Sequence, residues 1–418
     1  MLFPKSQDRG VLRTDSGACR ICGAATRAFL DLGKTPPANW LVATRSEKID
    51  EFPLVLESCL CGNFQLQHCL EADTLYRHYN YVTPQSPLLN AHYERLISYL
   101  MKAGYLNAES NVLEIGSNVG HFLAYLIPKV RSVLGVDPAQ NIAEIANAHG
   151  IPTVADFFNK DVAGRLARDR GEVEVIFARH CMAHNRNPYL ILDGIAELLS
   201  ENGVFVLENA YAITTFENNE FDQIYHEHMF YFSLRAVEEM LKRRGFVLHD
   251  VLFSSIHGGS ICCIAKRAGS NTPIRQSVIR GISREKLLLE QGLAERFANG
   301  AMRIQSTLRS EIGDLIAQGK SIYAYGATAK GATLLNCSGM TYHEIPFCAD
   351  STHMKQGRFI PKCGVEIVSE EWAFAHPPDV FLLTAWNYRD EIISKVRAAG
   401  LHDVQFIVPV PEVEIVIT

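Results

Sequence analysis

The sequence lacks an uninterrupted apolar run of about 18 residues, the length that a membrane-spanning helix requires. It also lacks an apolar segment near its start that would resemble a signal peptide, so we expect a cytoplasmic protein. An excess of basic charge is missing too, because 40 Lys and Arg stand against 46 Asp and Glu, for a net charge of −6. Since nucleic-acid-binding domains usually carry a basic surface, we expect neither a nucleic-acid nor a membrane partner.

The chain has 418 residues, too many for a single ordinary core, and no repeat of fixed period. We expect four parts along it. A small, loop-rich unit occupies residues 1–90, and an α/β unit follows over 91–267. A mostly polar helical linker covers 268–318, and a second α/β unit covers 319–418. The predicted fold class is therefore α/β with a small additional N-terminal domain.

The first α/β unit alternates buried strands with helices, which predicts a parallel sheet with right-handed crossovers. A helix is expected at the start, in LNAHYERLISYLMKAGYL, and another over LILDGIAELLSENG, residues 190–203. The predicted strands are NVLEIG, SVLGVD, IPTVADFF, VEVIFARH and GVFVLENA. The second α/β unit repeats this arrangement with SIYAYG, IPFCAD and VFLLTAWN as strands.

A glycine turn, VLEIGSNVG at residues 112–120, joins the first of these strands to its helix. Glycines at such a turn let the backbone approach a ligand closely, and a helix N-terminus favours acceptor groups. Asp137 ends the next strand, where a carboxylate can bind two ribose hydroxyls. This arrangement suits S-adenosylmethionine (SAM) or a dinucleotide such as NAD, and it also occurs as an ordinary turn in α/β proteins.

The spacing here is E-x-G-x-x-x-G rather than G-x-G-x-x-G, and it resembles motif I of class I SAM-dependent methyltransferases. Asp156 and Phe157 fall where such enzymes place an acid for the adenine amine and an apolar wall. The resemblance implies a SAM site made by Glu114, Gly116, Ser117, Asn118, Gly120, Asp137, Pro138, Asp156 and Phe157.

The stretch YHEH, residues 225–228, places two His around a Glu beside a Tyr. These residues could form a metal site, supply a catalytic base or serve only in packing. The spacing is not the helical H-E-x-x-H of zinc enzymes, and methyl transfer from a sulfonium needs no Lewis acid. A His with a pKa near about 6.5 suits the role of general base at neutral pH. His226 can be the structural member, with its side chain pointing away.

Eight stretches in order, covering nearly the whole chain, resemble the three-domain SAM-dependent sugar C-methyltransferases of deoxysugar and antibiotic biosynthesis. The stretches are CRIC with CLCGNFQL, YNYVTP, LEIGSNVG, ARHCMAHNRNP, FDQIYHEHMFYFS, IHGGS, YAYGATAKG and KQGRFIP. Members of this family have an N-terminal zinc-binding domain, a class I methyltransferase Rossmann-like core and a second Rossmann-like domain. They methylate a carbon of a nucleotide-linked 4-keto-6-deoxysugar, usually C3.

The resemblance also implies roles for individual residues. It places the general base at His228, an accompanying histidine at His184 and an aromatic donor at Tyr79. Tyr225 is expected to hydrogen-bond the sugar or its enolate, and Glu227 to orient an imidazole. The expected substrate-binding residues are Tyr81, Asn209, His257, Lys330, Lys355 and Arg358.

Cys19-x-x-Cys22 is half of a zinc-knuckle site, and a second C-x-x-C is the usual partner. Here the second half is Cys59-x-Cys61, one residue short, with Ser58 where the family has its other Cys. We expect a structural Zn²⁺ held by Cys19, Cys22, Cys59 and Cys61, with His68 or Cys69 as substitutes. The alternative is a set of reduced, buried cysteines, because disulfides are rare in cytoplasmic proteins.

Val119 is a second departure, because the family often has Asp at this place in the turn. Loss of the carboxylate would weaken contacts to the methionine amino group, and Asn118 or backbone carbonyls would have to compensate.

In the C-terminal unit, the turn in YAYGATAKG has backbone amides that can hold an anion, and Lys330 adds charge there. Lys355 and Arg358 follow the second strand, where Asp350 stands, and Arg suits bidentate phosphate binding. One hypothesis is that these cations bind the diphosphate of the substrate. The other is that the unit is a degenerate Rossmann-like domain whose charges are solvated. An NAD site is disfavoured by the glycine spacing. His257, beside glycines, fits either an active-site edge or a structural role.

The expected function is methylation of the carbon next to the ketone of a dTDP-linked 4-keto-deoxysugar, with SAM as the methyl donor. We expect a monomer or weak dimer. One alternative is a C-methyltransferase for a non-sugar, enolisable ketone in natural-product biosynthesis. Another is a non-catalytic zinc-ribbon protein that binds RNA or acts as a scaffold.

Overall fold

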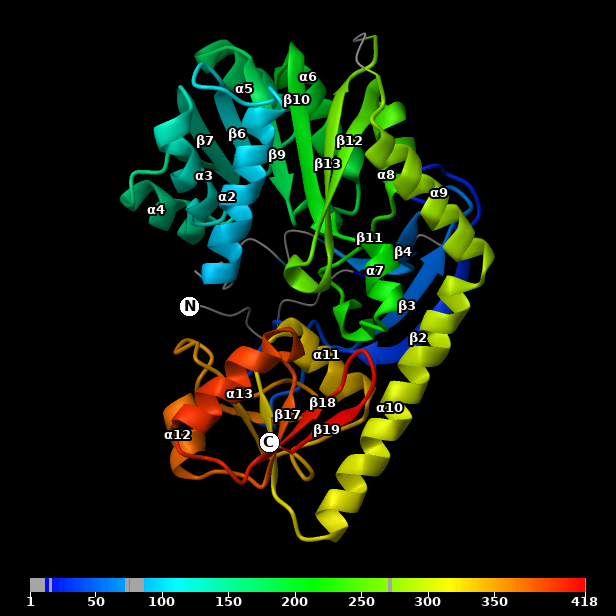
Figure 1. Ribbon diagram of the computed structural model, residues 1–418, viewed down its shortest axis with the longest axis vertical. Helices are drawn as coiled ribbons and strands as arrows, with labels where there is room; N and C mark the ends of the chain where they lie inside the picture. The colour runs from blue at the N-terminus through cyan, green and yellow to red at the C-terminus, as the bar shows by residue number, and fades with distance from the viewer. Residues whose placement is uncertain (1–11, 15–16, 72–74, 76–85, 270–272, 418) are drawn as a thin grey trace.

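The computed structural model describes residues 12–14, 17–71, 75, 86–269 and 273–417. Figure 1 shows a large sheet flanked by helices at the top, a second sheet with helices at the bottom and a small N-terminal sheet beside helices α7 and α10. The predicted α/β class is thereby confirmed. The boundaries predicted between the units remain a prediction.

The N-terminal unit is predicted to be loop-rich, but its described residues are built mainly on β-strands. Its sheet has the order β11-β4-β3-β2, so one strand comes from much later in the chain. A separate ribbon pairs β1 with β5. The strands are β1 (Leu12–Thr14), β2 (Arg27–Thr35), β3 (Phe52–Ser58), β4 (Phe64–Leu66), β5 (His68–Leu70) and β11 (Phe230–Tyr231).

The central sheet has seven strands in the order β12-β13-β10-β9-β6-β7-β8. The last strand in sequence, β13, lies between β10 and β12 and is antiparallel to both, whereas β6 to β10 run parallel. The carboxyl ends of the parallel strands therefore meet at one edge, where ligands bind in open α/β sheets. The strands are β6 (Asn111–Ile115), β7 (Ser132–Asp137), β8 (Thr153–Ala155), β9 (Val173–Arg179), β10 (Leu199–Ala210), β12 (Phe246–Ser254) and β13 (Ser260–Arg267).

Helices cover both faces of this sheet, joined by short turns (Figure 1). Helix α2 illustrates the local rules: Ser86 accepts a hydrogen bond from the amide of Leu89 at 3.2 Å, and Pro87 begins the helix. The helices are α2 (Pro87–Lys102), α3 (His121–Leu126), α4 (Gln140–Ala148), α5 (Lys160–Arg170), α6 (Pro188–Leu198), α7 (Ala212–Glu217) and α8 (Leu234–Lys242), with 3₁₀ turns η1 (Ile127–Lys129), η2 (Met182–His184), η3 (Phe221–Gln223) and η4 (Ile256–Gly258).

One predicted helix is too long. The apolar pattern predicts helix over 190–203, but α6 ends at Leu198 and β10 begins at Leu199. Leu199 pairs with Val173 on β9, and the register then shifts before Val204. Strand pairing in the sheet therefore overrides the helical periodicity of LLSENG.

The C-terminal sheet has the order β16-β15-β14-β17-β18-β19, parallel except for the edge strand β19. This is a second Rossmann-like sheet, as predicted. Its strands are β14 (Ile322–Tyr325), β15 (Phe347–Ala349), β16 (Glu366–Val368), β17 (Val380–Leu383), β18 (Gln405–Val408) and β19 (Glu414–Val416), with helices α11 (Ala329–Cys337), α12 (Glu370–Ala375) and α13 (Arg389–Ala398) and the 3₁₀ turn η5 (Trp386–Tyr388).

Two helices, α9 (Gln276–Glu290) and α10 (Leu293–Ala317), connect the two large sheets (Figure 1). Gly292 separates them with φ +78°, a conformation that glycine adopts without strain. Helix α10 buries one apolar stripe, in which Phe297 stacks on Phe216 of α7 with ring centroids 4.4 Å apart.

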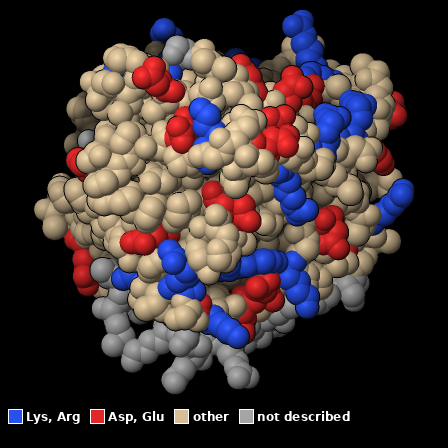
Figure 2. Space-filling view, turned by 90° about the horizontal axis from the view of Figure 1, so that it is seen from below, with Lys and Arg blue, Asp and Glu red and all other residues tan. Residues whose placement is uncertain are grey.

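Charges of both signs alternate on the face seen in Figure 2. Ion pairs in the C-terminal unit include Lys395 with Glu370 and Arg389 with Glu414, each at 2.9 Å. Among the described residues, no helix combines the length and the apolar character needed to cross a bilayer.

Candidate active site

The glycine turn after β6 is held in a conformation that only small residues allow. Gly116 has φ +68° and Gly120 has φ +78°. A Cβ on Gly116 would lie 2.7 Å from the Cβ of Cys181, and one on Gly120 would lie 2.5 Å from Cγ2 of Ile151. The turn is therefore packed closely against Cys181 and Ile151 at the two glycines.

Asp137, at the end of β7, holds this turn in place. Its carboxylate accepts hydrogen bonds from the amides of Asn118 at 2.9 Å and Ala139 at 3.0 Å. Burial raises the pKa of Asp137 above its ordinary value, and the two amides oppose that shift. A carboxylate has four acceptor positions, so these bonds leave capacity for ribose hydroxyls.

Val119 has a structural explanation. It is buried in a small apolar cluster with Ala139 and Ile142, at the start of α4. The side chain thus supports the turn through packing, at the position where the family often carries Asp.

The remaining predicted cofactor residues lie around the same edge. Asp156 and Phe157 follow β8, and Pro138 follows β7. Asp156 accepts a hydrogen bond from Arg165 at 2.7 Å and from the amide of Phe157 at 2.9 Å. Ser117 is buried, and its hydroxyl has no hydrogen-bond partner among the described residues.

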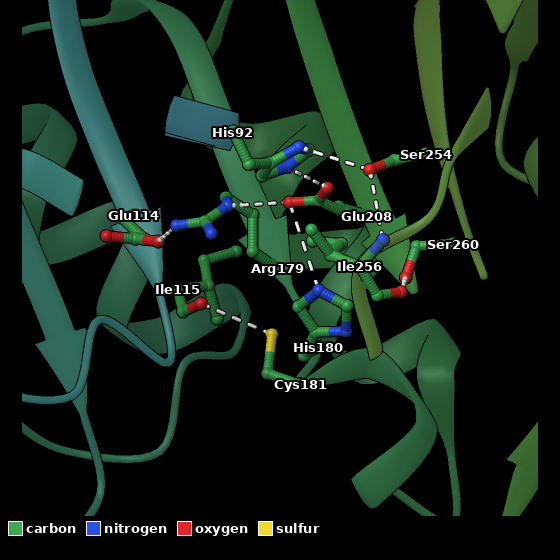
Figure 3. A network of polar contacts seen from close by, with 10 residues as sticks. All are labelled: His92, Glu114, Ile115, Arg179, His180, Cys181, Glu208, Ser254, Ile256 and Ser260. Carbon is green, nitrogen blue, oxygen red and sulfur yellow. Dashed lines mark hydrogen bonds and ion pairs between the residues drawn. The ribbon is translucent and has the colours of Figure 1, made fainter. Parts of the chain in front are cut away.

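Below the turn lies a buried network of charged groups, which Figure 3 shows. Arg179, at the end of β9, donates to Glu114 at 3.1 Å and to Glu208 at 2.8 Å. Its guanidinium lies over the rings of Phe122 and Tyr93. Glu114 therefore pairs with Arg179 beneath the turn, and burial raises the pKa of Glu114 to about 7 despite the cation.

Helix α2 joins this network through His92. The carboxylate of Glu208 accepts from Nε2 of His92 at 2.6 Å, and Nδ1 of His92 lies 3.2 Å from the hydroxyl of Ser254 (Figure 3). A carboxylate can only accept, so Nε2 carries the proton. The arginine and the histidine hold the pKa of Glu208 well below its usual range, although burial alone would raise it.

Two further histidines line the carboxyl edge. His180 follows β9 with φ +51°, and its ring contacts that of His257 edge-on with centroids 4.8 Å apart. Burial lowers the pKa of His180 to about 4 and that of His257 to about 3, so both rings are neutral near pH 7.

The YHEH segment lies between the methyltransferase sheet and the N-terminal unit. Turn η3 precedes it, and β11 follows it and pairs with β4 of the N-terminal sheet. The amide of Met229, next to His228, donates to the carbonyl of Ala183 in η2 at 2.8 Å. The segment is thus fixed on both sides by backbone bonds.

His228 has both ring nitrogens engaged. Nδ1 lies 3.3 Å from the carbonyl of Gln223, and Nε2 lies 2.7 Å from the hydroxyl of Tyr225. The carbonyl can only accept, so Nδ1 carries the proton and Nε2 presents its lone pair to the phenol. Burial, the neighbouring His184 and the more distant Lys330 hold the pKa of His228 well below its ordinary value. The imidazole is therefore a neutral base of fixed orientation.

The structure brings most of the predicted catalytic side chains together. The ring of His184 meets that of His228 edge-on at 5.0 Å, and burial lowers the pKa of His184 to about 4. Glu227 is buried and accepts from the side-chain amide of Asn39 at 3.1 Å. His226 is buried on the other side, beside the carbonyl of Phe52. Tyr79 and Tyr81 lie outside the described residues.

Two of the predicted substrate-binding residues offer buried donors. Asn209, at the end of β10, has a side-chain NH₂ without a hydrogen-bond partner among the described residues. The same holds for the ammonium of Lys330, which lies 4.8 Å from the centre of the Trp386 ring.

Lys355 and Arg358 are placed differently. Lys355 donates to the carbonyl of Ala327 at 2.8 Å and lies 3.6 Å from Asp350, so its charge supports the turn after β14. Arg358 is partly buried, and that burial lowers the pKa of its guanidinium. Their predicted role at a diphosphate remains a prediction.

The four predicted zinc ligands converge. Their sulfur atoms all lie within 4.8 Å of one another, with 3.7 Å from Cys19 to Cys61 and 3.4 Å from Cys22 to Cys59. A tetrahedral zinc with bonds of about 2.3 Å separates its sulfurs by about 3.8 Å, so the donor set fits Zn²⁺. The described cysteines form no disulfide. The short C-x-C spacing therefore supplies both sulfurs, and His68 and Cys69 lie outside the group.

The sequence reasoning missed several residues of this site. Arg179 and Glu208 lie near the carboxyl ends of predicted buried strands, which is a signal for a site in a parallel sheet. Asp222 and Gln223 stand just before YHEH, and Asn39 lies in a stretch read only as loop. Long-range contacts of this kind carry no local pattern.

Three family models match the chain. One named for zinc binding matches residues 19–76, one described as a methyltransferase domain matches residues 89–251, and one described as a C-methyltransferase C-terminal domain matches residues 255–411. The three matches follow one another along residues 19–411, and the C-terminal model also includes β13 of the central sheet.

Individual proteins match as well. The C-methyltransferase NovU of Streptomyces niveus is 34% identical over 409 residues, which span 95% of this chain and 96% of NovU. The uncharacterized methyltransferase YcgJ of Bacillus subtilis (strain 168) is 26% identical over 120 residues, 28% of this chain and 47% of YcgJ. Among solved structures, magnesium protoporphyrin IX methyltransferase of Synechocystis PCC 6803 with bound SAM is 14% identical with a TM-score of 0.34, covering 45% of this chain and 88% of that one.

Proposed function

This chain belongs to the three-domain family of SAM-dependent sugar C-methyltransferases, and on that premise we propose that it methylates a dTDP-linked 4-keto-deoxysugar. The methyl group is added to C3, the carbon next to the ketone, by way of an enolate, and His228 is the general base. The observation that carries the proposal is the Tyr225–His228 pair, because it presents a neutral, oriented imidazole.

Removal of the proton is the first step. A carbon next to a ketone is a weak acid, so a base must lie close to it and donors must lie close to the ketone oxygen. Nε2 of His228 takes the proton, the C–H electron pair moves toward the carbonyl oxygen, and Nδ1 keeps its bond to Gln223. The phenol of Tyr225, which lies 2.7 Å from Nε2 in the free enzyme, must leave this lone pair before the proton is taken, and it can then donate to the sugar.

The enolate oxygen needs donors that are in place before the reaction. The side-chain NH₂ of Asn209 and the ammonium of Lys330 are buried and have no hydrogen-bond partner among the described residues, so they are candidates for this role. His184 lies against His228 as a neutral ring, and Asn39 holds Glu227. We propose that these groups shape the pocket.

When bound at the glycine turn, SAM supplies an electrophilic methyl group on a sulfonium. The turn fits this cofactor because Gly116 and Gly120 allow its positive φ angles and close packing, and Asp137 keeps acceptor capacity. The methyl group would pass to the enolate carbon as its bond to sulfur breaks, with the electron pair left on the sulfur of S-adenosylhomocysteine. The proton stays on His228 until the product leaves. The zinc is structural: the four cysteines fix the sheet on which β11 is paired.

The non-catalytic alternative, a scaffold or RNA-binding protein, is wrong, because a C-methyltransferase is 34% identical over 95% of the chain. The acceptor is tested by incubating the enzyme with methyl-labelled SAM and either dTDP-4-keto-6-deoxysugars or free enolisable ketones. Mass spectrometry should find one labelled methyl on a nucleotide ketosugar. Labelling of free ketones alone would overturn the sugar assignment and support the non-sugar alternative.

We further propose that the enzyme works in the cytoplasm as a monomer or weak dimer. Light scattering of the purified protein across a concentration series checks the oligomeric state, and a stable tetramer or larger assembly would contradict it.

A further inference from the structure

Turn η3 is the point at which several parts of the active site meet. The carbonyl of Gln223 accepts from Nδ1 of His228 at 3.3 Å and from the hydroxyl of Tyr231 at 3.1 Å. Its side-chain amide donates to the carbonyl of His257 at 2.9 Å and to Glu220 at 2.5 Å. The direction of the His228 ring therefore depends on where η3 lies.

The C-terminal unit holds η3 from the other side. Nε1 of Trp386, in η5, donates to the carboxylate of Asp222 at 2.6 Å. Asp222 is fully buried and is the residue before Gln223. The ammonium of Lys330 lies over the same indole ring, and helix α11, which carries Lys330, packs on η3.

The same 3₁₀ turn touches a second edge of the site. Asn387 and Tyr388, which follow Trp386, line a small cavity of about 50 Å³ together with His257 and Gly258. Residues of η5 thus bond to η3 and line a cavity beside η4, and Gln223 links these two segments by its side chain.

The Trp386–Asp222 bond has a strong physical reason to persist. A hydrogen bond to a buried carboxylate is worth more than a neutral one, and loss of the donor leaves the acceptor unsatisfied. Oδ1 of Asp222 already has no partner among the described residues. Removal of the indole N–H therefore favours a displacement of Asp222, and the adjacent Gln223 carbonyl moves with it.

We propose that Trp386 is a positioning residue for the base: through Asp222 it fixes the Gln223 carbonyl and with it the ring of His228. The C-terminal unit then has a role in catalysis besides substrate binding. This inference rests on the proposed function, in which His228 removes the proton.

Trp386→Phe tests the inference, because it removes the N–H and keeps most of the ring. We expect kcat to fall about 10- to 100-fold, since small misplacements of a catalytic group have effects of this size. KM and the Kd for SAM should stay within about twofold of wild type, because only the chemical step is altered. The control is Trp372→Phe, a half-buried indole of the same unit that packs on Tyr323 and Phe347. Unchanged kcat in Trp386→Phe, or an equal fall in both variants, would overturn the inference.

A double-mutant cycle tests whether Asp222 carries the effect. Trp386→Phe and Asp222→Ala should each lower kcat, and the double variant should be little worse than the more impaired single variant. If the factors by which the two substitutions lower kcat multiply in the double variant, Trp386 acts independently of Asp222. Should Trp386→Phe not fold, Asp222→Asn keeps an acceptor oxygen but removes the charge, and a smaller loss confined to kcat is expected there. An unchanged kcat in that variant would count against the inference.

Nitrogen NMR of histidine-labelled protein separates this inference from the proposed function. In wild type the His228 ring should carry its proton on Nδ1, and in Trp386→Phe that hydrogen-bonded signal should shift or broaden. His228→Asn identifies the resonance. If the enzyme acts on no ketosugar, the proposed function fails, and the NMR result still decides the inference. An unchanged His228 signal in Trp386→Phe would overturn it.

Discussion

At the scale of single residues, the proposed mechanism depends on a histidine that stays neutral. His228 is surrounded by buried groups, and the pKa of His184 beside it is lowered to about 4 for the same reason. The carbonyl of Gln223 opposes the shift of His228 but does not outweigh burial. A base of this kind is ready at any pH above its own pKa.

This gives a pH prediction. A general base must be unprotonated, so kcat/KM falls only as pH drops through the pKa of His228 in the free enzyme. That pKa is lowered, so the acid limb of the kcat/KM profile should lie well below pH 6.5, the ordinary value for histidine. A profile measured with a nucleotide ketosugar between about pH 4.5 and 9 checks it. An acid limb at or above pH 6.5 would contradict the neutral, buried base.

Individual residues also mark where sequence reasoning succeeded. The cysteine types and their approximate places were sufficient to predict a four-sulfur site, although the C-x-C spacing left the fourth ligand open. The structure identifies Cys59 as a member of the group and leaves Ser58 outside it. The packing of Val119 against Ala139 and Ile142 could not be predicted, because it depends on how α4 approaches the turn.

At the scale of elements, the glycine turn can be tested with a matched pair of variants. Gly116→Ala places a methyl group 2.7 Å from the Cβ of Cys181 at a φ of +68°. We expect the turn to shift and the affinity for SAM to fall about tenfold or more. Gly150→Ala has a similar φ, +78°, but nothing within 4 Å. It should cost about 1 kcal/mol of stability without a change in SAM affinity.

Isothermal titration with SAM measures both variants. Equal losses of SAM affinity would show that backbone strain, and not the close approach at Gly116, decides binding.

The N-terminal sheet gives a second prediction at this scale. Strand β11 begins two residues after His228 and pairs with β4. The loop that joins β3 to β4 carries Cys59 and Cys61. Loss of the zinc should therefore loosen the segment that holds the base. We expect Cys61→Ser to bind zinc more weakly and to lose most methyl transfer, because structural zinc supplies folding energy to small domains.

The matched control is Cys69→Ala, a fully buried cysteine outside the group. Metal analysis and the methyl-transfer assay should find its zinc and activity close to wild type. Full activity in a zinc-free Cys61→Ser protein would contradict the link between the two.

The elements themselves were largely predictable. Alternation of buried strands and amphipathic helices predicted both sheets, and the exception was the end of α6, where pairing of Leu199 with Val173 prevailed. A periodic pattern reports the local preference of a segment, whereas the choice between helix and strand at its end depends on the neighbouring strand.

At the scale of the whole molecule, α10 runs beside the C-terminal unit and the N-terminal sheet and packs on α7, while α9 packs on β12 of the central sheet (Figure 1). Gly300 on this helix contacts Asn219, and Asn219 donates to the carbonyl of Pro411 at 3.3 Å. A Cβ on Gly300 would lie 2.1 Å from Oδ1 of Asn219. The glycine therefore permits the close approach of the connecting helix to the methyltransferase and C-terminal units.

Two alanine variants of the same helix should have opposite effects. Gly300→Ala should lower the free energy of unfolding by about 1–3 kcal/mol, because Asn219 must move. Gly313→Ala, at an exposed position with nothing within 4 Å, should raise it by roughly 0.5–1 kcal/mol, since alanine favours the helix. Urea unfolding measures both. Stabilisation by both substitutions would mean that α10 does not pack as described.

Contacts between distant segments were the part that the sequence could not predict. The Trp386–Asp222 and Asn39–Glu227 bonds join residues 164 and 188 positions apart. The first connects the C-terminal unit to η3, just before the YHEH segment, and the second connects the N-terminal unit to Glu227 within it. Only the assembled molecule reveals that all three units contribute to the environment of His228.

The measurement that tests the central claim most directly is hydrogen exchange at the carbon next to the ketone. The enzyme is incubated with a dTDP-4-keto-6-deoxysugar in heavy water without SAM, and mass spectrometry follows the uptake of deuterium. Wild type should introduce deuterium at C3. The exchange rate of His228→Asn should be lower by a factor of about 100 or more. Exchange by His228→Asn at the wild-type rate would contradict the assignment of His228 as the base.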